Sequence, residues 1–312
     1  MALLVPAAAP AAASDVLVAP PGASPRDQAV ARACRRGLGE TRGAVVAMDP
    51  RDGRVLALVN PVYGLFHAYQ PCSVFKLVVG LSALRAGVAT PETVYECDGG
   101  CWTWPGHGAI DLRRALAVSC NPYFEWLGER LGWDELRNGA HELGLGAITG
   151  VNLTGEVAGA LPARVDQGRV GHVSSHAAGI RATALQLAAL VSASVNGGNL
   201  FAPRLARPEG FEPQLRRQLG ASLPFGALLS GYYSAVTEGS AHGAFQPEIA
   251  VGAKTGSCSG VGWIASFAPL ERPEIVLVVF LRRGNGRQAS AVAGRIYADL
   301  IAEGVLRAPA PR

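Results

Sequence analysis

The spacing of apolar and polar residues divides the chain into strand-like ends and a helical middle. Ser24 and Pro25 combine a favoured N-cap with a favoured first helical residue, which predicts a helix that ends near Gly37. Two apolar runs follow, Gly43–Met48 and Arg54–Asn60, and an Asp-Gly pair lies between them. Since Asp-Gly between apolar runs is typical of a β-hairpin, this region is predicted to form two antiparallel strands.

The middle of the chain has the pattern of buried helices. Nearly every position from Ser73 to about Ala86 is apolar, so this predicted helix should have no solvent face. Thr183 and Gln186 have the spacing of a capping box at the start of another apolar helix. That helix is predicted to end at the turn that begins with Asn196.

The last part of the chain returns to the pattern of strands. Three short runs rich in β-branched residues are separated by Gly and Pro: Ile249–Gly256, Val261–Ala268 and Glu274–Leu281. Apolar residues at helical spacing then predict a final helix from Ala289 to Glu303.

Strands at both ends of the chain, with helices between them, are most simply combined in one sheet. The predicted fold class is therefore α+β: an antiparallel sheet built from N- and C-terminal strands and covered by terminal helices, with an inserted all-helical subdomain. We expect residues 24–306 to form a single domain, with its sheet part at about 24–65 and 245–306 and its helical part at about 66–244. Residues 1–23 are rich in Ala and Pro and are expected to be a disordered leader or export remnant.

Composition and charge argue against several classes of protein. Hydrophobic residues make up 49% of the chain and charged residues 17%, which is typical of a globular protein and not of a disordered one. The net charge is +4, and the basic residues are scattered as singles and pairs, which argues against nucleic-acid binding. No run of 18 apolar residues exists, so no transmembrane helix is expected.

Lysine is scarce in this sequence, and its positions are informative. Of 28 basic residues only Lys76 and Lys254 are lysines, and all the others are arginines. Arginine stays protonated in proteins, whereas a desolvated lysine can lose its proton. The two lysines therefore indicate places where the chemistry of an amine is needed.

Lys76 lies three residues after Ser73, so the two side chains share one face of the predicted helix. A serine hydroxyl is a weak nucleophile and needs a neighbouring base. Burial in an apolar helix and a second ammonium group, on Lys254, both disfavour the charged form of Lys76. We therefore predict that Ser73 is a nucleophile and that Lys76 is its base.

Two further motifs supply groups that such a nucleophile needs. A Ser-Cys-Asn motif at 119–121 precedes a proline, which predicts a loop directly before a helix. We expect Ser119 to carry a proton between Lys76 and the leaving group, and Asn121 to hold the amide of the substrate.

The other motif, Lys254-Thr255-Gly256-Ser257, ends a predicted strand. We expect Lys254 and Thr255 to bind a substrate carboxylate, and Gly256 to let the backbone approach a ligand closely. The N–H groups of Ser257 and Ser73 are predicted to form an oxyanion hole.

These three motifs, in this order on a predicted helix, loop and strand, resemble those of penicillin-binding protein transpeptidase domains and serine β-lactamases. The likeness to the transpeptidases covers about residues 40–300 and includes four further segments: Val46–Ala57, Gly155–Pro162, Ala182–Ala188 and Trp263–Pro269. The resemblance implies a serine-type D,D-transpeptidase or D-Ala-D-Ala carboxypeptidase, which cross-links or trims peptidoglycan stem peptides through an acyl-enzyme on Ser73. It also implies that β-lactams such as penicillin acylate Ser73, and that catalysis needs no cofactor.

The same resemblance implies a location in the periplasm or extracytoplasmic cell envelope, and partners among the proteins of cell-wall synthesis. The export signal is weak, because Ala11–Ala13 before Ser14 resembles a cleavage site but no basic residue precedes it. The expected location is therefore based on the family resemblance of the motifs and not on an export signal.

Other functions share these motifs. A class D-like serine β-lactamase has an apolar third residue in the middle motif, where this chain has Asn121. A class A β-lactamase uses a Glu-x-x-x-Asn loop, and the four residues after Glu156 include no asparagine. A non-catalytic β-lactam-sensing domain is marked by a membrane-signalling segment, and none is visible. The motifs alone do not separate transpeptidation from carboxypeptidation.

The cysteines suggest a metal site or a disulfide. Four residues have a spacing suited to a structural zinc site that braces the loop of the second motif: Cys97, Cys101, His107 and Cys120. A Cys97–Cys101 disulfide and free buried thiols are the alternatives. Cys34 is expected to be a core residue on its helix.

The remaining histidines have no acid at a useful sequence spacing, so we expect them to be ordinary surface or core residues: His67, His141, His172, His176 and His242. Glu125, Glu129 and Glu135 are expected to lie on a solvated helix face.

Overall fold

The computed structural model describes residues 23–205, 212–220 and 223–307. The expected leader, residues 1–23, lies outside the described residues except for its last position. The described chain folds around a five-stranded antiparallel sheet with the strand order β2-β1-β9-β8-β7. The strands are β1 (Gly43–Met48), β2 (Val55–Val59), β7 (Gly252–Cys258), β8 (Val261–Ala268) and β9 (Ile275–Leu281).

The two ends of the chain meet in this sheet. β1 pairs with β2 in the predicted hairpin, and on its other side it pairs with β9, where Val45 is opposite Val279. The predicted fold class, with one sheet built from N- and C-terminal strands, is therefore confirmed.

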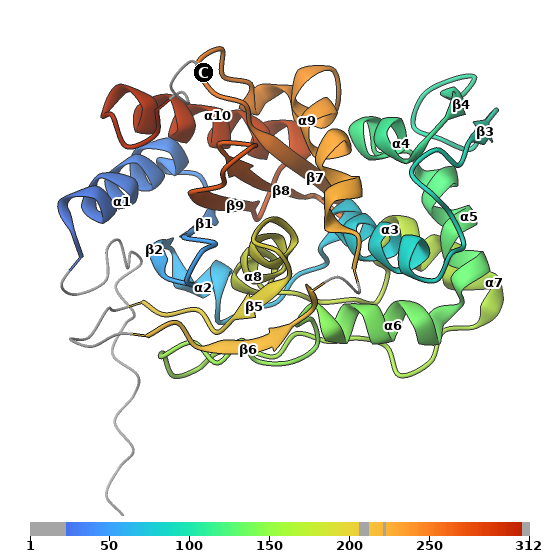
Figure 1. Cartoon of the computed structure of the whole chain (residues 1–312), viewed down its shortest axis with the longest axis horizontal. Coiled ribbons are helices and arrows are strands. Elements are labelled where there is room, and N and C mark those ends of the chain that lie inside the picture. The colour runs from blue at the N-terminus through green and yellow to red at the C-terminus, as the bar shows by residue number, and fades with distance from the viewer. Residues whose placement is uncertain (1–22, 206–211, 221–222, 308–312) are drawn as a thin grey trace, which may run out of the picture.

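Helices cover both faces of the sheet, so β1, β2, β8 and β9 are apolar at nearly every position, whereas β7 carries the polar third motif. α1 (Pro25–Leu38) and α10 (Gly286–Ala302) lie on one face, and α8 (Ala184–Val195) lies on the other (Figure 1). In β1, Val45 and Ala47 belong to the core under α1 and α10, whereas Val46 and Met48 belong to the core on the α8 side. This alternation follows from the two-residue period of a strand.

The predicted helix starts are confirmed by their hydrogen bonds. Ser24 Oγ accepts a hydrogen bond from the N–H of Asp27 at 3.1 Å and begins α1. Thr183 and Gln186 form the predicted capping box of α8, with N···O distances of 2.8 and 3.1 Å. Asn285 begins α10 with a second capping box, so this helix starts slightly before its predicted position.

The part inserted between β2 and β7 is mostly helical, as predicted, and adds two short two-stranded sheets that the sequence did not suggest. Its α-helices are α2 (Pro61–Gly64), α3 (Lys76–Arg85), α4 (Leu112–Val118), α5 (Asn121–Leu131), α6 (Trp133–Glu142), α7 (Gln167–His176) and α9 (Leu229–Thr237). Its short 3-10 helices include η1 (Cys72–Phe75), η3 (Phe225–Leu228) and η4 (His242–Ala244). The small sheets pair β3 (Tyr95–Cys97) with β4 (Gly108–Ile110), and β5 (Asn199–Phe201) with β6 (Leu215–Gln218).

The helix predicted from Ser73 begins as a 3-10 turn. η1 precedes α3, which starts at Lys76 and is buried as far as Ala83, as its apolar sequence predicted. Cys72, at the start of η1, has a positive φ of 53°, a conformation that side chains rarely adopt. A 3-10 turn such as η1 is common at the start of an α-helix. Among the described residues, no helix is both long and apolar enough to span a bilayer.

Candidate active site

The three motifs meet in one pocket although they are far apart in sequence. The pocket has a volume of about 360 Å³, and five motif residues line it: Ser73, Ser119, Asn121, Thr255 and Ser257. They come from η1, from the junction of α4 and α5, and from β7. Lys76 and Lys254 contact these residues from the interior and are almost completely buried.

The amine of Lys76 has three hydrogen-bond partners. Its Nζ donates to the carbonyl oxygen of Ser119 at 2.8 Å, to Asn121 Oδ1 at 2.6 Å and to Ser119 Oγ at 3.3 Å. Burial lowers the pKa of Lys76 from 10.5 to about 7, against the weaker attraction of nearby acidic groups. Much of Lys76 is therefore neutral at neutral pH, which is the form that a proton acceptor needs.

The hydroxyl of Ser119 joins the two lysines. Lys254 Nζ donates to Ser119 Oγ and to the carbonyl oxygen of Thr255, both at 2.8 Å. Burial, together with the positive charge of Lys76, holds the pKa of Lys254 well below its ordinary value. Ser119 has a φ of 57° at the end of α4, and strained backbone of this kind is often found at functional sites.

The side chain of Ser73 does not bond to Lys76 in this structure. Its hydroxyl donates to the carbonyl oxygen of Ser175 at 3.5 Å, and the three hydrogen bonds of Lys76 go to other residues. Catalytic hydrogen bonds are often long or misaligned without substrate and tighten in the complex. The two residues share one helical turn, as their spacing required, and the hydroxyl must rotate toward Lys76 to react.

Gly256 brings β7 against the start of η1. A Cβ atom at this position would lie 2.7 Å from the carbonyl oxygen of Pro71, closer than a real side chain allows. Glycine is therefore needed for the strand that carries Ser257 to approach the turn that carries Ser73.

The hydroxyl groups of the third motif have partners within the site. Thr255 Oγ1 lies 2.6 Å from Ser240 Oγ, and Ser257 Oγ accepts a hydrogen bond from the N–H of Gly286 at 2.7 Å. These contacts tie β7 to the neighbouring loop and to the first residue of α10. The polar edge of the pocket is thereby held in place.

A disulfide that the sequence analysis missed joins the first and third motifs. Cys72 and Cys258 are bonded at a sequence separation of 186, with their Cα atoms 5.7 Å apart. Cys72 directly precedes Ser73 and Cys258 directly follows Ser257, so the bond flanks both residues predicted to form the oxyanion hole. The available signal was that each cysteine adjoins a motif and that these motifs were expected to converge.

The four candidate metal ligands lie together. Their ligand atoms are all within 4.8 Å of one another: Cys97, Cys101, His107 and Cys120. Cys97 Sγ is 3.5 Å from both His107 Nδ1 and Cys120 Sγ, and the buried Nε2 of His107 has no hydrogen-bond partner. The alternative Cys97–Cys101 disulfide is wrong, because both are free thiols. Three thiols and one imidazole are a donor set that suits tetrahedral zinc.

One histidine lines the pocket, contrary to expectation. His176 Nε2 lies 3.5 Å from Asn121 Nδ2, and its Nδ1 lies 2.5 Å from Ser175 Oγ. Glu125, expected on a solvated face, is only 3.8 Å from the ring. Glu125 and His176 come together because α5 packs against α7, so their distance along the sequence could not reveal the contact. Three other histidines bond to backbone carbonyl groups as structural residues: His67, His141 and His242.

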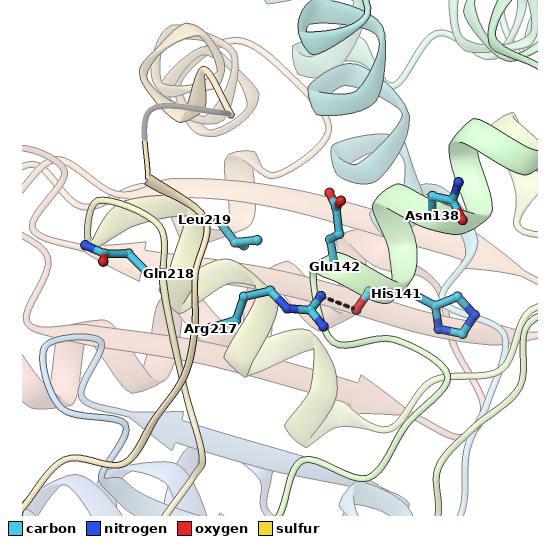
Figure 2. Close-up of a pocket in the computed structure, with 6 residues that line it drawn as sticks. All are labelled: Asn138, His141, Glu142, Arg217, Gln218 and Leu219. Carbon is cyan, nitrogen blue, oxygen red and sulfur yellow. Dashed lines mark hydrogen bonds between the residues drawn. The ribbon is translucent and has the colours of Figure 1, made fainter.

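Figure 2 shows a larger pocket, of about 510 Å³. It is lined by Asn138, His141, Glu142, Arg217, Gln218 and Leu219. Arg217 donates to the carbonyl oxygen of His141 there at 3.1 Å. None of the predicted site residues lines it, so the size of a pocket does not identify the site here.

Comparison with known families matches residues 43–302 to the penicillin binding protein transpeptidase domain. Stage V sporulation protein D of Bacillus subtilis is 30% identical over 318 residues, which cover 83% of this chain and 49% of that protein. Peptidoglycan D,D-transpeptidase MrdA of Acinetobacter baumannii is 24% identical over 340 residues, which cover 83% of this chain and 51% of that protein. The chain thus spans about half the length of these relatives.

The fold is also found in solved structures. The D,D-transpeptidase domain of a peptidoglycan glycosyltransferase from Eggerthella lenta superimposes with a TM-score of 0.79 at 23% sequence identity. The match covers 89% of this chain and 82% of that chain. At this identity the likeness concerns the fold alone.

Proposed function

This chain belongs to the penicillin-binding protein transpeptidase family, and on that premise we propose that it is an acyl-serine D,D-transpeptidase or carboxypeptidase. Its substrates are peptidoglycan stem peptides that end in D-Ala-D-Ala, and penicillin acylates the same serine. The observation that carries the proposal is the hydroxyl of Ser119, which links two buried lysines of lowered pKa beside Ser73.

Acylation follows from the placement of these groups. Neutral Lys76 accepts the proton of Ser73, and the serine oxygen forms a bond to the carbonyl carbon of the penultimate D-Ala. The N–H groups of Ser73 and Ser257 stabilise the oxyanion. The peptide C–N bond then breaks, and the proton on Lys76 passes through Ser119 to the amine of the departing D-Ala. Asn121 holds the amide of the bound stem peptide.

The third motif binds the terminal carboxylate of the substrate. Thr255 lines the pocket and offers its hydroxyl directly, whereas the amine of Lys254 lies buried behind it. Lys254 therefore acts through its hydrogen bond to Ser119 and not by direct contact with the carboxylate. The acyl-enzyme then reacts with an amine acceptor to give a cross-link, or with water to give a trimmed peptide.

We further propose that residues 24–306 act as one transpeptidase-like domain. The family match covers most of this range, and α1 and α10 pack on the sheet whose strand β7 carries the third motif. The substrate places the domain in the periplasm or on the outer side of the cell membrane, where it works with other proteins of cell-wall synthesis.

A fluorescent penicillin tests the proposed function. We expect one covalent label per chain, which persists over hours and is absent in Ser73→Ala, because Ser73 has the base and proton carrier beside it. Ser230→Ala, at an exposed serine of α9, is the matched control and keeps the label. Labelling is followed by intact mass and by fluorescence over time. An unlabelled wild-type protein contradicts the proposal, and loss of the label within minutes favours a β-lactamase.

We also propose that Cys97, Cys101, His107 and Cys120 hold a structural zinc ion. The clustering of their ligand atoms and the 3.5 Å distances from Cys97 Sγ to His107 Nδ1 and to Cys120 Sγ support this proposal. Burial lowers the pKa of His107, which keeps its ring in the neutral form that binds metals. Cys120 lies between Ser119 and Asn121, so the ion would brace the second motif without taking part in acyl transfer.

Metal analysis tests the zinc site. We expect about one zinc ion per chain in protein prepared with zinc, and a strongly reduced content in His107→Ala. His67→Ala, at an exposed histidine, is the control and keeps the ion. A chelator is expected to lower the melting temperature of the wild type and of the control, and to leave His107→Ala unchanged. Absence of zinc from the wild type contradicts the proposal.

A further inference from the structure

A chain of hydrogen bonds leaves the catalytic pocket and ends at a carboxylate. It begins at Lys76, whose Nζ donates to Asn121 Oδ1 at 2.6 Å. Because the oxygen of this amide faces Lys76, its NH₂ group faces the other way. There, Asn121 Nδ2 lies 3.5 Å from Nε2 of His176. The side-chain amide therefore connects Lys76 with His176.

The carboxylate of Glu125 fixes the direction of each hydrogen bond in this chain. Ser175 Oγ lies 2.7 Å from Glu125 Oε1, and an ionised carboxylate only accepts, so the hydroxyl of Ser175 donates to it. The same hydroxyl lies 2.5 Å from His176 Nδ1 and must accept there, which puts the ring proton on Nδ1. Nε2 then carries a lone pair and accepts from Asn121. Every donor points from Lys76 toward Glu125.

The surroundings of His176 favour the neutral ring that this chain needs. Burial, followed by the positive charges of His172 and Lys76, lowers the pKa of His176, and the opposing attraction of Glu125 is weaker. These three groups belong to the helix of His176 and to two helices packed against it, and Glu238 and Arg287 line the same pocket. His172 is on the same helix, Glu125 is on α5, and Lys76 is on α3.

We propose that His176, held by Ser175 and Glu125, is a positioning residue that fixes the amide of Asn121 for reaction at Ser73, and that protonation of its ring breaks this arrangement. An imidazolium carries N–H groups on both nitrogens, so its Nε2–H would face the NH₂ group of Asn121. Two donors repel each other, and the amide must turn. Asn121 Oδ1 then no longer accepts the hydrogen bond from Lys76, and the amide is no longer oriented to bind the substrate. This inference rests on the proposed acyl-transfer function.

The test compares two substitutions of His176. Glutamine offers an oxygen that accepts from Asn121 at any pH, whereas leucine offers no acceptor. We expect His176→Gln to acylate with penicillin at a rate close to wild type near about pH 7.5. His176→Leu is expected to slow the acylation step about tenfold, the effect of one lost hydrogen bond. His67→Gln, at an exposed histidine that does not line the pocket, is the matched control and behaves as wild type.

The pH dependence separates positioning from simple packing. The rate of His176→Gln divided by that of wild type should rise as the pH falls below the pKa of His176, by up to about tenfold per pH unit. Lys76 titrates in both proteins, so its own effect on the rate largely cancels in this ratio. A ratio that is constant from about pH 4.5 to about pH 8.5 overturns the inference while the proposed function stands. If no protein is labelled at any pH, the proposed function itself fails.

Discussion

Replacing Lys76 with methionine is expected to slow the acylation of Ser73 by penicillin by about 10³- to 10⁴-fold, toward the upper end of what a lost general base costs. Methionine fills a similar buried volume but can neither accept the serine proton nor donate to Ser119 and Asn121. Stopped-flow measurement of the acylation rate checks this result, with circular dichroism to show that the variant is folded.

Lys76→Arg distinguishes the role of the base from the role of its charge. Arginine keeps the positive charge and the donors but does not lose its proton, so this variant should be as slow as Lys76→Met. In the wild type, the neutral amine is the reactive form and the pKa of Lys76 is about 7, so the acylation rate should rise with pH through this region and level off above it. A fast Lys76→Arg variant, or a rate that falls as the pH rises through this region, contradicts the role assigned to Lys76.

Removing the Cys72–Cys258 disulfide is expected to lower the free energy of unfolding by about 2–5 kcal/mol. The bond closes a long loop, at a sequence separation of 186, and so restricts the unfolded chain strongly. It also links the residues next to Ser73 and Ser257, so acylation should slow because the two backbone N–H groups are no longer held together. Denaturant unfolding and penicillin labelling of Cys72→Ala/Cys258→Ala measure the two effects.

Reductant provides the control for this experiment. A thiol reductant should destabilise the wild type toward the level of the double variant and leave the double variant unchanged, because its four remaining cysteines form no disulfide. If reductant destabilises both proteins equally, the effect does not come from this bond. If the double variant is acylated at the wild-type rate, the disulfide stabilises the fold without positioning the oxyanion hole.

Local signals explain what could be predicted from the sequence. The helix caps at Ser24 and Thr183, and the Asp-Gly turn before Arg54, depend on hydrogen bonds and dihedral preferences among near neighbours, so a short stretch of sequence contains them. Lys76 and Lys254 were recognisable because a buried amine has a chemistry that arginine lacks. That strands from both ends of the chain share one sheet could be inferred, whereas the pairing of β1 with β9 within it was not predicted.

Contacts between distant side chains could not be predicted in the same way. Glu125 and His176 were both expected to be ordinary residues, and they meet only because α5 packs on α7. Cys72 and Cys258 bond because glycine at position 256 lets β7 approach η1. The hydroxyl of Ser73, predicted to face Lys76, instead lies against the carbonyl oxygen of Ser175 on α7.

The sequence by itself determined the strands of the main sheet, the helices with clear start signals, the fold class and the three motifs, because each of these is encoded by residues close together or by a strict order along the chain. The tertiary structure alone decided which partner each polar group has: two amines on the hydroxyl of Ser119, an imidazole on the amide of Asn121, and a disulfide beside Ser73. Such partners depend on how whole helices and strands pack against each other, and no pattern within a single element specifies that packing.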